Sequence, residues 1–132
     1  MSKFKQAKNT DDAANVFMPI INFVRPLSKF VCLQLIASKS MYELNFYILD
    51  NNGKRIFRNS LSEEQEAFDD NKLGKITDKV VKDLRKSTNI YDDSQLNVYN
   101  ITINNRDVSI NVEYLENTGH NMYLVKKKWM LG

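Results

Sequence analysis

The chain contains one cysteine and one histidine, the two side chains that most often act together as a nucleophile and its base. Cys32 lies inside the apolar run FVCLQLIA, where a free cysteine usually behaves as a small buried hydrophobic residue. His120 lies far along the chain in the polar stretch NTGHN, where we expect an exposed side chain without a catalytic role. These two residues therefore do not predict a nucleophilic site.

Other patterns for catalysis and ligand binding are also missing from the sequence. The chain has four glycines and neither of the glycine-rich motifs that hold nucleotide phosphates. A zinc site needs clustered Cys and His, and a calcium loop needs alternating oxygen ligands and a glycine. None of the paired acidic residues stands in the apolar context that tunes carboxyl groups for acid–base catalysis. We expect no catalytic residue, no metal site and no cofactor, and hence a protein that is not an enzyme.

Charged residues are unevenly distributed, although the net charge is only +3. Residues 60–70 contain acidic residues and no basic one, whereas lysines and arginines dominate 72–86 and three lysines occupy 126–128. Such runs usually form solvated faces, so an acidic run gains functional meaning only opposite a basic partner. We name as the acidic cluster Glu63, Glu64, Glu66, Asp69 and Asp70, extended by Asp92 and Asp93.

Length and composition indicate a single domain over residues 1–132. Apolar residues make up 42% of the chain and charged residues 27%, which excludes collagen, low-complexity disorder and a disulfide-built miniprotein. No apolar run approaches the roughly 20 residues of a membrane span, so we expect no membrane partner. The start, MSKFKQAKNTDD, lacks the apolar segment of a signal peptide. We therefore predict a cytoplasmic protein, with residues 1–9 as a disordered extension.

The first half of the chain predicts one helix and three strands. Apolar residues recur at helical spacing over 13–24, with Pro19 inside the pattern and Pro26 ending it. The apolar run 30–37 predicts a buried strand, and strict alternation over 41–49 predicts a second strand with one buried face. Residues 50–53 (DNNG) form a turn signal, and 54–58 supply a third, short strand.

The second half predicts another helix and two strands. Residues 60–71 are polar and acidic, and we expect a loop or a frayed turn there. Spaced apolar residues predict an amphipathic helix over about 73–87. Alternation predicts strands over 96–103 and 108–114, and its slip between Val98 and Tyr99 predicts a β-bulge. The pattern of residues 121–132 does not decide between a helix and a strand.

These elements predict an α+β fold in the order α-β-β-β-α-β-β-tail. Strands joined by hairpins form an antiparallel sheet, and both main helices can pack on its one apolar face. The expected architecture is a two-layer sandwich with a sheet of about five strands.

The residues by themselves favour a protein-binding module. Most aromatic residues fall at positions that the strand and helix periods assign to the core, and the basic middle helix has a single arginine. No recognition-helix or ribonucleoprotein-type signature is present, so we expect no direct contact with nucleic acid. Uneven surface charge on a scaffold without catalytic residues is typical of a module that selects a protein partner electrostatically.

Three stretches of the chain resemble the YezG-type immunity proteins, which inhibit bacterial polymorphic toxins. The first, over 16–37, reads VFMPIINFVRPLSKFVCLQLIA and predicts a proline-interrupted helix leading into a strand. The second, over 73–85, reads LGKITDKVVKDLR and forms the middle helix. The third combines the hairpin LNVYNITINNRDVSINVEYLE with the ending KKWMLG, although the turn NNRD lacks the glycine usual in that family.

The resemblance implies an immunity protein of a contact-dependent growth inhibition or secreted toxin system. Such a protein binds one cognate toxin domain, expected to be a nuclease, and blocks it in the producing cell. Because nuclease clefts are basic, the acidic cluster is the predicted toxin-binding surface. The alternative is a secretion chaperone or another non-catalytic adaptor. Secretion chaperones tend to be acidic dimers, whereas this chain has a pI near 8.9, and we expect a monomer.

Overall fold

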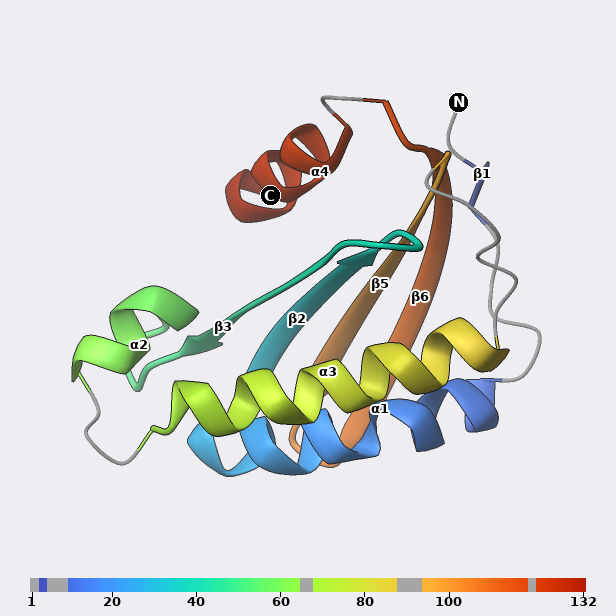
Figure 1. Cartoon of the computed structure of the whole chain (residues 1–132). Helices are drawn as coiled ribbons and strands as arrows, with labels where there is room; N and C mark the ends of the chain where they lie inside the picture. Colours follow the sequence, from blue (N-terminus) through green and yellow to red (C-terminus); the bar gives the residue numbers. More distant parts are fainter. Residues whose placement is uncertain (1–2, 5–9, 65–67, 88–93, 119–120) are drawn as a thin grey trace.

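The computed structural model describes residues 3–4, 10–64, 68–87, 94–118 and 121–132 (Figure 1). Its helices are α1 (Thr10–Val24), the short 3-10 helix η1 (Arg25–Leu27), α2 (Arg58–Glu64), α3 (Asp70–Ser87) and α4 (Asn121–Leu131). Its strands are β1 (Lys3–Phe4), β2 (Phe30–Ala37), β3 (Tyr42–Leu49), β4 (Arg55–Phe57), β5 (Gln95–Asn104) and β6 (Asp107–Glu116). Each strand and both main helices predicted from the sequence are present, with ends shifted by at most three residues.

All strands belong to one antiparallel sheet in the order β1-β6-β5-β2-β3-β4. The central strand, β2, pairs with β3 through the hairpin at its end and with β5 across a long sequence separation. Its register sets Leu33 opposite Phe46 on one side and opposite Ile101 on the other. One face of the sheet therefore receives a continuous row of apolar side chains from β3, β2 and β5.

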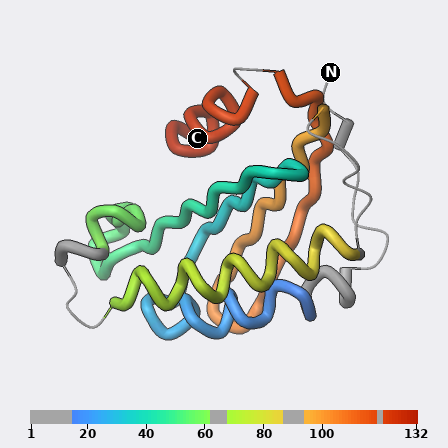
Figure 2. Tube along the Cα trace, viewed as in Figure 1, coloured from blue at the N-terminus to red at the C-terminus, as the bar shows by residue number. Residues whose placement is uncertain are grey.

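Helices α1 and α3 lie side by side across that apolar face (Figures 1 and 2). From α1, Phe17, Ile20 and Val24 are fully buried, and Pro19 lies on the exposed side of the helix. Proline cannot donate to the carbonyl of Asn15, four residues earlier, and on this exposed side water can reach that carbonyl. The buried positions of α3 include those that helical spacing predicted, namely Leu73, Val80, Val81 and Leu84. This arrangement confirms the predicted two-layer α+β fold.

The β5–β6 turn shows why the hairpin needs no glycine. The two residues between the strands are Asn105 and Arg106, and Asn105 has a φ of 57°. Asparagine tolerates this left-handed conformation better than most residues because its short polar side chain bonds locally. The N–H of Asn105 also donates to the carbonyl of Lys29 at 2.7 Å.

The acidic segment 60–71 is not simply a loop, contrary to expectation. Helix α2 includes its first residues, and α3 begins at Asp70, three residues earlier than predicted. Leu61 is fully buried against the main core and anchors α2, so one apolar side chain overrides the polar composition around it. Residues 65–67 lie outside the described part of the chain.

The predicted β-bulge between Val98 and Tyr99 is wrong. The β5–β6 ladder pairs without a break from Gln95 with Glu116 to Asn104 with Asp107. Both residues are buried, because Tyr99 faces the main core and Val98 faces a second apolar cluster on the other side of the sheet. The alternation slips because two faces are covered at this point, and the backbone remains regular.

The undecided segment at 121–132 is mostly helix α4, which lies over the sheet face opposite α1 and α3 (Figure 1). Met122 and Val125 pack against the second cluster, formed by Ile36, Leu96 and Val98. Of residues 1–9, the predicted disordered extension, the structure describes Lys3–Phe4, which pair with Tyr114 and Glu113 of β6. The remaining residues of that extension lie outside the described part.

Candidate functional site

The acidic cluster is only partly within the described residues. Glu66, Asp92 and Asp93 lie outside them, and Glu63 and Glu64 are described in their backbone alone, in the last turn of α2. Asp69 accepts a hydrogen bond from the N–H of Lys72 at 3.0 Å and thereby caps α3. Asp70 pairs with Nε of Arg58 at 2.7 Å. Both described carboxylates hold the start of α3 in place, and the role of the cluster in toxin binding stays a prediction.

Cys32 lies on β2, on the sheet face that α4 partly covers, and its side chain is half-buried. Its cross-strand neighbour is Tyr47, whose ring is 7% exposed. Burial raises the pKa of the Tyr47 hydroxyl above its ordinary value of 10.0, and the hydrogen bond with Cys32 raises it further. The guanidinium of Arg55, 4.7 Å from the ring centroid, opposes these effects. The contact thus pairs the thiol of Cys32 with a hydroxyl, and it contains neither the histidine nor the carboxylate of a nucleophile–base pair.

Tyr47→Phe is expected to flatten the loss of stability at alkaline pH. Because the pKa of Tyr47 is raised in the folded state, the unfolded chain ionises first as the pH rises above 10.0. The contribution of Tyr47 to stability is thus complete below pH 10.0 and is lost at higher pH. Urea unfolding from pH 8 to pH 11 measures this, and Tyr123→Phe on the exposed side of α4 is the control. Equal slopes for wild type and Tyr47→Phe would contradict the assignment.

Four amide side chains form a row across neighbouring strands on the sheet face that also carries Cys32 and Tyr47. Asn45, Gln34, Asn100 and Asn111 are consecutive register partners on β3, β2, β5 and β6. Gln34 is 2% exposed and donates through Nε2 to Oδ1 of Asn100 at 3.1 Å. Its Oε1 and the Nδ2 of Asn45 are buried without a hydrogen-bond partner. A buried polar atom left unpaired costs about 1–3 kcal/mol, so this row is less favourable in the fold than a fully paired one would be.

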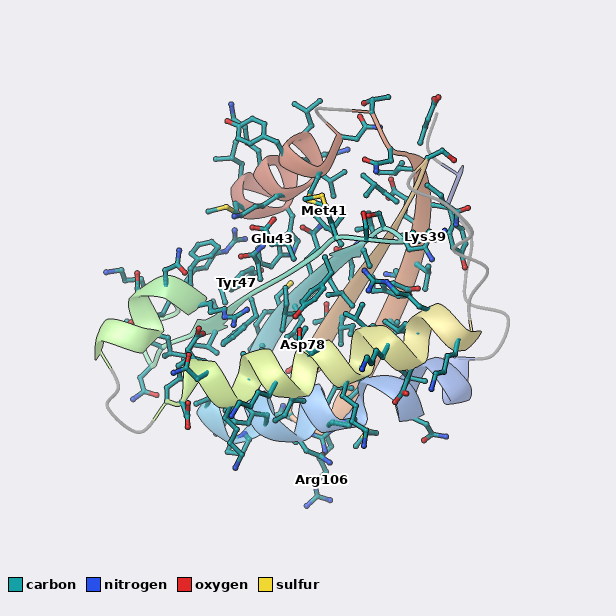
Figure 3. The ribbon with its side chains drawn as sticks, in the orientation of Figure 1. Lys39, Met41, Glu43, Tyr47, Asp78 and Arg106 are labelled. Carbon is teal, nitrogen blue, oxygen red and sulfur yellow. The ribbon has the colours of Figure 1, made fainter. Side chains whose placement is uncertain are left out.

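The inward side of α4 is held on the sheet by aromatic and polar contacts. The ring of Trp129 packs 5.5 Å from that of Tyr47 and 6.0 Å from that of Phe57, measured between centroids. Lys126 pairs with Glu43 at 2.9 Å, and Figure 3 shows Glu43 and Tyr47 on the strand below the helix. Arg55 donates to the carbonyls of Met130 and Gly132. These contacts fix which side of α4 faces outward.

The outward side of α4 combines exposed apolar side chains with lysines. Tyr123, Leu124 and Leu131 are 63%, 54% and 77% exposed, and Lys127 and Lys128 lie between them along the helix. The Nζ of Lys127 is 5.9 Å from the Tyr123 ring centroid, within range of a cation–π interaction. We call these five residues the exposed α4 surface. Met41, in the β2–β3 turn, is 59% exposed and is labelled in Figure 3.

Sequence reasoning missed this surface, although the segment carried a signal for it. The run NMYLVKKKWML has apolar residues on every side of a helix, which is more than one face can bury against a sheet. The excess has to remain exposed or be covered by another molecule. The helix-or-strand identity of the segment had to be known before this excess could be recognised.

An open cleft of about 800 Å³ lies on the surface between η1 and the β3–β4 turn. Arg25, Lys29 and Asp50 contribute the charges of its lining. Asp50 uses Oδ1 to accept hydrogen bonds from the N–H groups of Asn52 and Lys54, so it holds the turn. Arg25 lines the cleft with a half-buried side chain whose Nε is buried without a hydrogen-bond partner. With Asp50 engaged in the turn, the charged groups that the cleft presents are mainly those of Arg25 and Lys29.

Comparison of the chain with protein-family models, with curated proteins and with solved structures gives no match. The resemblance to immunity proteins consequently remains a prediction. Within the described ranges, no group of three or more His, Cys, Asp or Glu side chains could hold a metal ion. No helix in that part of the chain combines the length and the apolar character needed to cross a membrane.

Proposed function

We propose that this chain is an immunity protein, which binds a cognate toxin domain by protein–protein contact and carries out no chemistry itself. The observation that carries the proposal is the exposed α4 surface, where large apolar side chains gather on one helix. Exposed apolar residues gathered in one patch mark interaction sites in proteins that otherwise bury such residues. The likeness of three stretches to YezG-type immunity proteins supports a toxin domain as the partner.

The finer parts of the proposal concern the kind of toxin, the compartment and the oligomeric state. We take the toxin to be a nuclease and the cytoplasm to be the place where the chain protects the producing cell. The chain is proposed to act as a monomer of 15.4 kDa, whereas a secretion chaperone would be expected to form a dimer. Light scattering on the purified chain measures this mass.

Growth rescue tests the proposed function directly. The probe is the protein encoded by the reading frame adjacent to that of this chain, called here the candidate toxin. The candidate toxin alone is expected to arrest growth, and co-expression of this chain is expected to restore it. In the purified system, the chain should inhibit nucleic-acid hydrolysis when the two proteins are present in equal amounts.

Inhibition of the folded candidate toxin separates an immunity protein from a chaperone. A chaperone binds its client before secretion, and this activity does not require inhibition of an enzyme that is already folded. Asn22→Ala, an exposed change on α1 far from α4 in the fold, should rescue growth as wild type does. Growth arrest that co-expression leaves unrelieved, with no complex on size exclusion, would overturn the proposal.

A further inference from the structure

We infer that the exposed α4 surface binds an acidic, partly apolar surface of the partner, and that this contact lies outside any nucleic-acid cleft. The inference rests on the proposed function and deepens it by naming the surface and the chemistry of its partner. On one side of α4, Lys127 and Lys128 lie among the exposed apolar residues Tyr123, Leu124 and Leu131.

The charge of α4 determines what kind of partner fits. The helix has three consecutive lysines and no acidic residue. Lys126 is already paired with Glu43, whereas Lys127 and Lys128 are exposed and have no carboxylate partner among the described residues. Two uncompensated positive charges beside apolar side chains favour a partner whose apolar patch is bordered by aspartate or glutamate. Such complementarity sets encounter rate and partner choice.

A second copy of this chain does not fit the same surface. In a two-fold dimer the same patch of both copies forms the interface, so Lys127 and Lys128 of both copies would lie in it with no acidic residue of α4 to balance them. Like charges placed opposite one another in an interface cost several kcal/mol. The charge pattern therefore favours a different molecule over self-association.

A lipid surface is also a poorer fit than a protein. A helix that lies in a membrane interface uses an aromatic residue such as tryptophan on its apolar face as an anchor. Trp129 instead points inward and packs on Tyr47 and Phe57, so it is not available to a bilayer. The exposed large apolar residues of α4 are Tyr123, Leu124, Met130 and Leu131, with lysines between them, and none of them is a tryptophan.

The positive charge of α4 also indicates which part of the toxin's surface it contacts. A nuclease binds phosphates in a basic cleft, and a lysine-bearing helix is repelled from such a cleft. Inhibition through α4 would therefore use a site away from the substrate cleft. This differs from the role expected of the acidic cluster, whose charge would fit the substrate cleft itself.

Matched charge reversals test the inference. The double variant Lys127→Glu with Lys128→Glu is compared with Lys79→Glu with Lys82→Glu, which changes two exposed lysines of α3 by the same charge, away from the acidic cluster. The α4 variant should lose at least about tenfold in affinity for the candidate toxin by calorimetry. Leu124→Asp should lose a similar factor, and the α3 variant should stay within about threefold of wild type.

Salt supplies a second readout for the same variants. Raising the salt from about 0.1 M to 1 M shortens the screening length from about 10 Å to about 3 Å. The difference in affinity between wild type and the α4 double variant should shrink accordingly. Fluorescence of Trp129, the single tryptophan of the chain, checks that α4 remains docked in each variant.

The possible outcomes separate the inference from the proposed function. If the α4 and α3 variants bind the candidate toxin equally well, the inference is wrong while the proposed function stands. Dimerisation through α4, or sedimentation with vesicles containing phosphatidylserine that Leu124→Asp abolishes, also overturns the inference. A wild-type chain that neither binds the candidate toxin nor rescues growth contradicts both.

Discussion

Trp129→Ala is expected to release α4 from the sheet and to lower partner affinity by more than about tenfold. The Trp129 ring packs against Tyr47 and Phe57, and it is the largest inward side chain of the helix. A fully buried aromatic truncated to alanine costs about 3–5 kcal/mol, and Trp129 is only partly buried, so we expect about 2–3 kcal/mol. A helix of 11 residues is marginal in water once it loses its packing surface.

Hydrogen exchange and affinity measurements check this prediction together. Amide protons of 121–131 should exchange faster in Trp129→Ala, while those of β2 and β5 stay protected, because α4 opens without the rest of the sheet. Binding falls because the exposed α4 surface exists only while the helix is ordered. Unchanged protection of 121–131 would show that Trp129 does not hold α4 in place.

Trp129→Phe is the matched control for the same position. The Nε1 of Trp129 is buried without a hydrogen-bond partner, and phenylalanine removes this unpaired donor while keeping a ring against Tyr47. The smaller ring loses some packing, but the cost of the unpaired donor disappears too. We expect α4 to stay docked and partner affinity to remain within about threefold of wild type.

Phe17→Ala is expected to cause the largest loss of global stability, about 3–5 kcal/mol. Phe17 is fully buried, and its ring centroid lies 5.2 Å from that of Tyr99, so it joins α1 to the sheet. Domains of this size are stable by only about 5–15 kcal/mol, and the thermal midpoint should fall by roughly 10–20 °C. Urea unfolding followed by circular dichroism measures the change.

A large loss of stability is expected only from substitutions on the buried side of α1. Asn22→Ala lies on the same helix at an exposed position and should change stability by no more than about 0.5 kcal/mol. Trp129→Ala should lower the stability of α4 alone. Phe17→Ala should lower the stability of α1, α3 and the sheet together, because they unfold as one unit. A loss below about 1 kcal/mol for Phe17→Ala would mean that this side chain is not part of the packed core.

Elements with one buried face were predictable from the sequence. In β3, Tyr42, Leu44, Phe46 and Ile48 alternate, and all four face the main core. In α3, the apolar stripe lies against α1 and the sheet. In both elements, packing against the main core produces the period of the pattern. Tyr47 departs from it, because Trp129 covers this residue on the other face of β3.

Predictions from the sequence failed where a residue packs against a second part of the fold. The slip at Val98 and Tyr99 resembles a bulge if one face is assumed to be buried, but each residue lies in a different core. Helix α2 depends on Leu61, a single apolar residue whose burial arises from its contact with the distant core. Neither contact can be predicted from the composition of the surrounding sequence.

The acidic cluster illustrates a similar limit for function. Sequence spacing groups Asp69 and Asp70 with the glutamates before them, but in the structure Asp69 caps α3 and Asp70 pairs with Arg58. A run of charges shows that charge is present and leaves open whether the fold already uses it. The proposed surface on α4 emerged only once the inward side of that helix was known.

The amino-acid sequence alone determined the α+β class, the order of the main strands and helices, and the identity of one buried face. These depend on local periodicity, because burial against one layer repeats every two residues in a strand and about every 3.6 in a helix. Tertiary structure alone decided that α4 covers the opposite face, that Trp129 points inward and that Lys127 and Lys128 face solvent. The reason is physical: which side of a helix remains available to a partner depends on which neighbour covers the other side.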